Sequence, residues 1–310
     1  MATFAGIDCG TNSIRLLIVE RGPDGVCRDV LRTMRVVRLG EGLDDSGVIS
    51  RAALDRTFAA CADYAQIIAA HDVQRMRFMA TSASRDARNR EEFIDGVNRL
   101  MGVRPEVITG AEEAALSFGG AIGSPVVRDA APGPRLVVDI GGGSTEFVLG
   151  EDAPSAARSV DIGCVRLAER WLRADPPAAA ELAALAGDAD AAIARAATEV
   201  PLGSAASLIG VAGTVTTVAA LALGLPEYDA DALHGAVISA GDVHRVAAEL
   251  AAMTLAQRLA LPVMHPGRAD VIVSGALIWS RIVTAVGLPH VVVSEHDILD
   301  GIARSAATGC

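Results

Sequence analysis

The stretch from Leu136 to Gly150 constrains what this chain can fold into more than any other. An apolar run ends in Asp139, three glycines follow shortly after it, and apolar residues resume after Glu146. This pattern predicts a buried strand, a tight turn and a second strand that returns beside the first. Because glycine has no Cβ atom, the turn can aim successive backbone N–H groups at one anion. We therefore predict a phosphate-binding hairpin.

Two carboxylates flank the predicted turn. Asp139 ends the first strand, and Glu146 lies in the returning strand. Carboxylate oxygens are hard donors that suit Mg²⁺, and a hairpin would bring both side chains to the same ion. Mg²⁺ is the cofactor that we expect, with Mn²⁺ as the alternative.

The same design occurs near the N-terminus, where the stretch from Gly6 to Val19 again contains an apolar strand, an aspartate, a polar turn with glycine and a second apolar strand. Four pairs of positions align: Asp8 with Asp139, Gly10 with Gly141, Ser13 with Ser144 and Arg15 with Glu146. Either turn alone also fits a tight hairpin that binds nothing. Two matched stretches instead predict two related domains that face each other across a cleft and hold a phosphate chain from both sides.

Composition narrows the class of protein. A chain of 310 residues, 51% of them hydrophobic, suits roughly two domains with large cores. The formal charge of −11 disfavours nucleic acid as a partner, because such partners need a basic surface. All 27 basic residues are arginine, which excludes mechanisms that depend on a lysine.

The five cysteines are scattered, odd in number and without a CxxC pair, which disfavours zinc and a disulfide framework. No basic leader precedes the first strand, and no apolar run reaches about 18 residues. We expect a soluble cytoplasmic protein with no membrane partner.

A second candidate anion site follows the strand expected at residues 74–80. Thr81 to Arg85 combine hydroxyls, the N–H groups of a helix start and an arginine; the alternative is a Ser-capped surface helix with a solvated Arg85. Thr109 and Glu112 are spaced as a capping box for a helix that begins near residue 111. Glu113 falls outside that box, so it is either a general base or a surface glutamate that favours the helix dipole.

Other features carry weaker signals. The turn at Gly213 and Thr214 suits either a phosphate or nucleotide at a helix start, or tight packing. His265 stands beside proline and glycine, where a structural role is the more common one, and we interpret His296 and Asp300 as surface or packing residues of a final helix. Residues 123–134, rich in glycine and proline, fit a linker between domains. We further expect strands at 35–39 and 271–274, a helix from 242 to about 261, and a final helix capped by Ser294.

Five motifs follow one another along the chain: Asp8-Cys-Gly-Thr-Asn-Ser13 with Arg15, Ala80-Thr-Ser-Ala83 with Arg85, Thr109-Gly-Ala-Glu-Glu-Ala114, Asp139-Ile-Gly-Gly-Gly-Ser-Thr-Glu146 and Gly210-Val-Ala-Gly-Thr214. They occur in the order seen in the exopolyphosphatase/guanosine-pentaphosphate phosphohydrolase (Ppx/GppA) family, which this chain resembles over nearly its whole length. Two departures stand out. Relatives often carry an acidic residue at the position of Ala111, and longer members carry a C-terminal helical domain that is expected to be missing here.

The resemblance implies an α/β fold of the actin-like, sugar-kinase and heat-shock-protein superfamily, with two ribonuclease H-like domains and an active-site cleft between them. Residues 1–122 would form the first domain, residues 123–295 the second, and a helix at 296–310 would pack back on the first. By this likeness Glu113 is the catalytic residue, and Asp139 and Glu146 hold the metal, with Asp8 as a further contributor. The phosphate-binding residues would be Gly10, Thr11, Asn12, Ser13, Arg85, Gly141, Gly142, Gly143 and Ser144. A homodimer is also implied.

The expected reaction is the Mg²⁺-dependent hydrolysis of the terminal phosphoanhydride of inorganic polyphosphate, with release of orthophosphate. Hydrolysis of guanosine pentaphosphate at its 5′ end is the close alternative, and it requires a guanosine pocket. An ATP-dependent kinase or switch is more distant, because it needs an adenosine site at residues 210–214. A non-catalytic polyphosphate-binding protein is the remaining alternative.

Overall fold

The computed structural model describes residues 2–308, which divide into two units. Unit 1 contains the residues up to Gly120 together with those from Ile298 onward, and unit 2 runs from Ala121 to Asp297. The chain passes from one unit to the other after Gly120 and again after Asp297, each time two residues from the boundary expected from the sequence. Among residues 2–308, no helix has the length and apolar character needed to cross a membrane.

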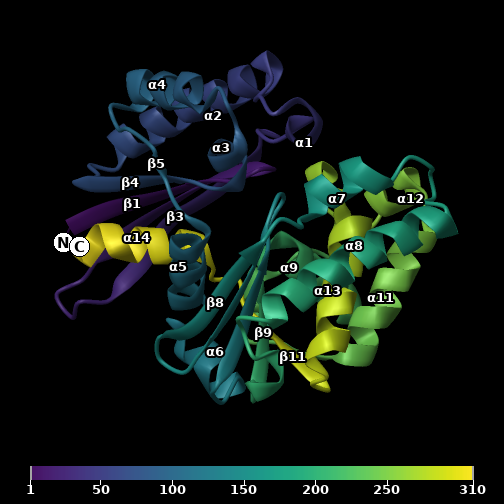
Figure 1. Cartoon of the computed structure of the whole chain (residues 1–310). Helices are drawn as coiled ribbons and strands as arrows, with labels where there is room; N and C mark the ends of the chain where they lie inside the picture. The colour runs from purple at the N-terminus through teal and green to yellow at the C-terminus, as the bar shows by residue number, and fades with distance from the viewer. Residues whose placement is uncertain (1, 309–310) are drawn as a thin grey trace. The chain divides into compact units, whose positions relative to one another are not determined.

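Unit 1 is a five-stranded mixed sheet covered by helices (Figure 1). Its strands are β1 (Ala2–Cys9), β2 (Ser13–Arg21), β3 (Cys27–Val36), β4 (Arg75–Ala80) and β5 (Glu106–Val107). The helices that follow or cover them are α1 (Leu43–Ser46), α2 (Arg51–Ala70), α3 (Ser82–Asp86), α4 (Arg90–Met101), α5 (Gly110–Ile122) and α14 (Ile298–Thr308). The strand order is β3-β2-β1-β4-β5; β1, β2 and β3 pair antiparallel, whereas β4 is parallel to both β1 and β5.

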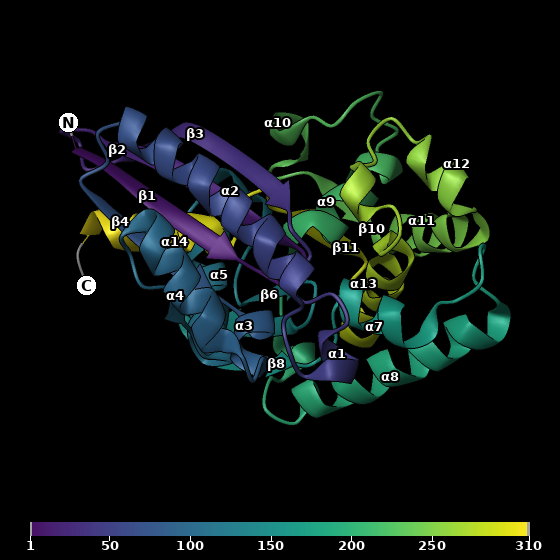
Figure 2. The ribbon, with the colours of Figure 1, turned by 90° about the horizontal axis from the view of Figure 1, so that it is seen from above.

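Side chains of β1 alternate between the two faces of this sheet, as the two-residue period of a strand requires. Ile7 and Cys9 join the apolar core that includes α2 and α4, whereas Phe4 packs with α14. The two groups of helices lie on opposite sides of the sheet in Figure 1, and Figure 2 shows α2 and α4 next to each other. Asp8 stands between Ile7 and Cys9, so its carboxylate faces away from the α2 and α4 core.

Unit 2 repeats this topology in a six-stranded sheet of order β10-β11-β9-β6-β7-β8. Its strands are β6 (Arg135–Ile140), β7 (Thr145–Gly150), β8 (Pro154–Val160), β9 (Ser207–Val211), β10 (Val237–Ser239) and β11 (His290–Val293). Its helices are α6 (Pro125–Ala130), α7 (Cys164–Trp171), α8 (Ala179–Ala197), α9 (Ala212–Ala222), α10 (Ala230–Leu233), α11 (Ala240–Ala252), α12 (Leu255–Leu259) and α13 (Ile272–Val286). Two short 3₁₀ turns span Leu202–Ser204 and Pro266–Arg268.

Strands β6, β7, β8, β9 and β11 hold the same places in unit 2 as β1 to β5 hold in unit 1, and β10 is added at one edge. Within this unit one large apolar core joins the sheet to α8, α9, α11 and α13 (Figure 1). The α/β class and the pair of ribonuclease H-like units expected from the sequence are therefore confirmed.

Several predicted elements were wrong in detail. The expected linker at residues 123–134 contains α6, which begins with Pro125, a residue suited to the first turn of a helix. Only the first two residues of the strand expected at 35–39 lie in a strand, β3, which begins at Cys27 and ends at Val36. The final helix begins at Ile298, because the side chain of Ser294 bonds to the backbone of His296 and does not cap a helix at once.

Two further errors lie in the second half of unit 2. Residues 271–274 form no strand; Ile272 to Ser274 begin α13, and a short apolar run cannot distinguish a buried helix from a buried strand. The helix expected from 242 to about 261 is two helices, α11 and α12. Thr254 starts the second through a capping box with Gln257, a signal that was present in the sequence.

The capping box at the start of α5 is confirmed, and it allows a stability prediction. The Glu112 carboxylate accepts bonds from the backbone N–H of Thr109 at 3.0 Å and from its hydroxyl at 3.1 Å. These bonds lower the pKa of Glu112 below the ordinary value of a glutamate side chain. Because the folded state favours the ionised carboxylate, its stabilisation is present above the pKa of the unfolded chain and is lost as the pH falls through the lowered pKa.

We expect Glu112→Ala to lower the free energy of unfolding by about 1 kcal/mol at pH 7. The difference from wild type should shrink as the pH is lowered below 4.5. Thermal unfolding of both proteins from pH 7 to pH 3 measures this effect. Glu112→Gln is the control, since an uncharged amide keeps the box without titrating; a pH-independent difference for Glu112→Ala would contradict the prediction.

Candidate functional site

The glycine turn of unit 2 is a tight hairpin between β6 and β7. Asp139 and Glu146 lie directly opposite each other in the antiparallel register, and the N–H of Gly141 donates to the carbonyl of Ser144 at 3.0 Å. The predicted strand-turn-strand is therefore confirmed, with both carboxylates on the same face.

Helix α7 supports this turn from behind. Its first N–H groups donate to the turn's carbonyls: Cys164 to Gly141 at 3.0 Å, and Val165 and Arg166 to Gly142 at 2.9 and 3.0 Å. The Arg166 Nε donates to the carbonyl of Gly143 at 2.8 Å. Because N–H and C=O point in opposite directions across a trans peptide, the N–H groups of Gly142, Gly143 and Ser144 are directed away from α7. The turn thus presents three successive donors to an anion.

Sequence reasoning missed this supporting role. Gly163 is the residue whose identity could have indicated it. A Cβ atom on Gly163 would lie 2.4 Å from the carbonyl carbon of Gly142, so only glycine lets the helix start approach the turn this closely.

The turn of unit 1 is built in the same way with a different support. The N–H of Gly10 donates to the carbonyl of Ser13 at 2.9 Å. The carbonyl of Thr11 accepts from Gly40 at 3.0 Å, and that of Asn12 accepts from Val37 and Arg38 at 3.0 and 2.8 Å. The N–H groups of Asn12 and Ser13 therefore point away from residues 37–40.

The two turns differ at the residue opposite the aspartate. In unit 1, Arg15 faces Asp8 and donates to its Oδ2 from Nε at 3.0 Å and from Nη2 at 2.6 Å. In unit 2, Glu146 lies opposite Asp139, so two carboxylates are neighbours on adjacent strands. Both are buried: Glu146 is 1% exposed and Asp139 is 6% exposed. Like charges this close need a compensating cation. The unit 1 turn therefore places an arginine opposite its aspartate, whereas the unit 2 turn places a second carboxylate there, an arrangement that suits a cation.

Mg²⁺ fits the donor set of the unit 2 pair. Among residues 2–308 no group of three or more Asp, Glu, His or Cys side chains is arranged to hold a metal. Mg²⁺ commonly uses one or two carboxylates and completes its shell with waters and substrate phosphates, so two carboxylates suffice. Ser159 supports the pair by donating to Glu146 Oε1 at 2.7 Å.

Glu113 is not the surface residue of the alternative interpretation. It is only 8% exposed, in the first turn of α5, and its Oε2 accepts a bond from Arg85 Nη1 at 3.0 Å. Arg85 comes from α3, directly after β4, and is not fully solvated either. The structure thus brings the expected general base and the expected phosphate-binding arginine together within unit 1.

The hydroxyls next to Arg85 are buried and partly used by the fold. Thr11 Oγ1 and Ser82 Oγ are 2.9 Å apart, which links the unit 1 turn to α3. The segment from Thr81 to Ser84 is therefore buried and contacts the unit 1 turn through Ser82. It is not the Ser-capped surface helix of the alternative interpretation.

Packing explains the glycines after β9. A Cβ atom on Gly210 would meet Trp279 at 2.8 Å, and one on Gly213 would meet the Arg268 guanidinium at 2.3 Å. Ala212, between them, has a φ of 68°, which is costly for alanine and marks a constrained strand-to-helix turn. Of the two interpretations of this turn, tight packing is the one with direct support.

The two histidine candidates have structural partners. His265 Nδ1 accepts from the N–H of Gly267 at 3.1 Å, and burial together with Arg268 lowers the pKa of His265. His296 lies before α14 with its ring 4.3 Å from that of His234, whereas Asp300 is buried in α14 and pairs with Arg32 of β3 at 2.6 Å.

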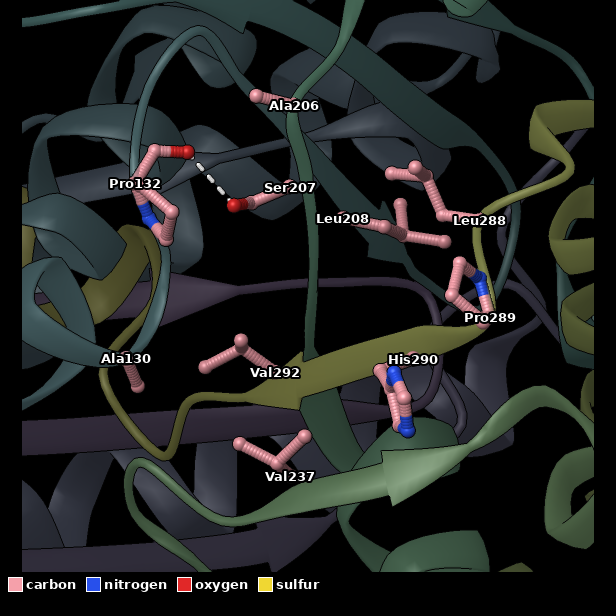
Figure 3. Close-up of a pocket in the computed structure, with 10 residues that line it drawn as sticks. All are labelled: Ala130, Pro132, Ala206, Ser207, Leu208, Val237, Leu288, Pro289, His290 and Val292. Atoms are coloured by element: carbon pink, nitrogen blue, oxygen red, sulfur yellow. Dashed lines mark hydrogen bonds between the residues drawn. The ribbon is translucent and has the colours of Figure 1, made fainter.

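A pocket of about 330 Å³ lies in unit 2 at the start of β9 and β11 (Figure 3). Apolar side chains such as Leu208 and Val292 line it, and Ser207 Oγ donates to the carbonyl of Pro132 at 2.6 Å. This is the end of the sheet away from Asp139, which pairs with the last residue of β9. Ligands of parallel α/β sheets bind at the carboxyl ends of the strands, and the turn after Asp139 lies at that end.

Known proteins place the chain among phosphatases. The model of the Ppx/GppA phosphatase family matches residues 18–307. Exopolyphosphatase 2 of Mycobacterium tuberculosis is 46% identical over 319 aligned residues, which cover 99% of each chain. A solved exopolyphosphatase-like protein has a TM-score of 0.93 and 46% identity, with 98% of this chain and 97% of that one covered.

A second group of relatives carries a different name. The guanosine-5′-triphosphate,3′-diphosphate pyrophosphatase of Vibrio campbellii is 36% identical over 171 residues, which cover 55% of this chain and 33% of that one. Family match, full-length identity and fold agree, and the chain belongs to the Ppx/GppA phosphatase family.

Proposed function

We propose that this protein is an exopolyphosphatase, which hydrolyses the terminal phosphoanhydride bond of inorganic polyphosphate and releases orthophosphate. The observation that carries the proposal is its 46% identity, over 99% of the chain, to a mycobacterial protein named exopolyphosphatase. The glycine-containing turns after β1 and β6 support the proposal, since their backbone N–H groups would donate to the phosphate oxygens of a polyphosphate.

The proposed roles follow from the contacts of each residue. The N–H groups of Gly142, Gly143 and Ser144 would donate to phosphate oxygens, as would those of Asn12 and Ser13. Glu113 would orient the attacking water and accept its proton. The water oxygen bonds to the terminal phosphorus as the bond to the bridging oxygen breaks, and the electron pair leaves with the shortened chain.

Asp139 and Glu146 would hold the Mg²⁺, with Mn²⁺ as the alternative. When bound, the ion supplies positive charge that neutralises the phosphoryl oxygens. Asp8 is the further candidate ligand that we propose, and its Oδ2 is also paired with Arg15 at 2.6 Å.

Guanosine pentaphosphate is the second candidate substrate. The relative from Vibrio campbellii that is 36% identical over 171 residues is named for activity on this nucleotide. Its 5′ end carries the same phosphoanhydride chemistry, so the proposed residues would act on either substrate.

The test is phosphate release from tripolyphosphate, long-chain polyphosphate and guanosine pentaphosphate, each with Mg²⁺, Mn²⁺ or a chelator. We expect metal-dependent release, fastest from polyphosphate, and a fall of at least about 100-fold for Asp139→Asn. Asp152→Asn, an exposed aspartate of unit 2, is the matched control and should stay at the wild-type rate. No release by wild type from any of the three would overturn the proposal, and faster release from the nucleotide would assign the second candidate.

A further inference from the structure

Arg85 uses one of its terminal nitrogens for two different partners. Its Nη1 donates to the backbone carbonyl of Ile108 and to Glu113 Oε2, each at 3.0 Å. A guanidinium Nη1 carries two hydrogens, so both are engaged. The Ile108 carbonyl follows directly after β5, where backbone pairing limits its movement. Arg85 is therefore anchored to the sheet and to the expected base at the same time.

The opposite edge of this guanidinium has no such partner. Among residues 2–308, no protein group accepts a hydrogen bond from Nη2 or Nε of Arg85. The side chain is 26% exposed, so solvent and ligands can reach it. Two parallel N–H groups on a guanidinium edge match the spacing of two oxygens on one phosphate.

We infer that Arg85 is a positioning residue for Glu113, in addition to any contact with phosphate: one nitrogen fixes the carboxylate while the opposite edge holds the substrate. This inference rests on the proposed phosphatase function. Glu113 has three side-chain torsions, and its bond to an anchored arginine limits the orientations that the carboxylate can adopt. Substrate and base would thus be held by one rigid planar group, and the distance between them would be set by the guanidinium itself.

Lysine is the informative replacement, because it keeps the positive charge but loses the planar fork. A lysine ammonium can bind a phosphate as a point charge, yet it cannot bond Ile108, Glu113 and a phosphate edge in one plane. Arg85→Lys should therefore separate binding from positioning. Arg88→Lys is the matched control, since Arg88 lies three residues on and donates to the carbonyl of Ser46 on the surface.

The experiment is a double-mutant cycle with Arg85→Lys, Glu113→Gln and the double variant. We measure kcat for phosphate release, and the affinity for an imido-bridged tripolyphosphate by calorimetry. We expect Arg85→Lys to lower kcat by about 10-fold or more in the wild-type background but by less than about 3-fold in the Glu113→Gln background. Its effect on analogue affinity should be the same in both backgrounds.

Two results would overturn the inference while leaving the proposed function intact. One is an undiminished kcat loss from Arg85→Lys in the Glu113→Gln background, which would make Arg85 a phosphate ligand only. The other is a loss of kcat in Arg88→Lys equal to that in Arg85→Lys, which would indicate a structural effect on α3 and the segment after it. Failure of the proposed function is a separate outcome, because it requires that wild type releases no phosphate.

Discussion

Glu113→Gln is expected to lower kcat for phosphate release by about 10²- to 10⁴-fold, because general-base catalysis contributes on that scale. The amide has the same shape as the carboxylate, and its oxygen can still accept the bond from Arg85 Nη1, which is 3.0 Å long in the wild type. The amide cannot take a proton from water. Affinity for the imido-bridged tripolyphosphate should therefore change by less than about 3-fold, since a residue that acts only in the chemical step lowers kcat without weakening substrate binding.

Glu112→Gln is the matched control for this variant. The two glutamates are neighbours in the first turn of α5, but Glu112 bonds to Thr109 and is exposed, whereas Glu113 is buried beside Arg85. We expect Glu112→Gln to keep kcat within about 2-fold of wild type, because the capping box accepts glutamine. Equal losses in the two variants would mean that the start of α5 matters only for folding, and Glu113 would lose its catalytic assignment.

Gly301→Ala should give the largest loss of stability among single methyl additions in unit 1. A Cβ atom on Gly301 of α14 would lie 2.2 Å from the carbonyl oxygen of Leu116 in α5 and 2.9 Å from its carbonyl carbon. Both are backbone atoms, so the contact is relieved only if one helix moves. Overpacking of this kind costs about 1–3 kcal/mol, which exceeds the gain of about 1 kcal/mol in helix propensity from Gly to Ala.

Gly119→Ala is the control, for which we expect a change in stability in the opposite direction. Gly119 is in α5, near Leu116, and a Cβ atom there meets nothing within 4 Å. We expect it to raise the melting temperature slightly, whereas Gly301→Ala should lower it and speed hydrogen exchange of the α14 amides. An unchanged exchange rate in α14 for Gly301→Ala would show that the two helices tolerate a larger separation than this packing implies.

The resemblance in sequence identified the main candidates of the site, and the structure shows which neighbours they have. Glu113 could not be assigned from spacing alone, because a buried base and an exposed glutamate occupy the same position after a capping box. Arg85, whose hydrogen bond shows that Glu113 is not a solvated surface residue, lies 28 residues earlier in the chain. Likewise, sequence placed Asp8 among the metal ligands, and only the structure shows that its Oδ2 is paired with Arg15 at 2.6 Å.

The sequence by itself determined the two hairpins, because their strands, glycines and facing residues are contiguous, and a short turn brings such residues together whatever surrounds them. Only the tertiary structure decided what holds each turn in place. Helix α7 binds the carbonyls of residues 141–143, and residues 37–40 bind those of Thr11 and Asn12. These supporting segments lie some 20 to 30 residues away in the chain. Their backbone hydrogen bonds do not depend on which side chains are present, so the sequence carries almost no sign of them. The exception is a glycine at a position where the two backbones approach too closely for a Cβ atom.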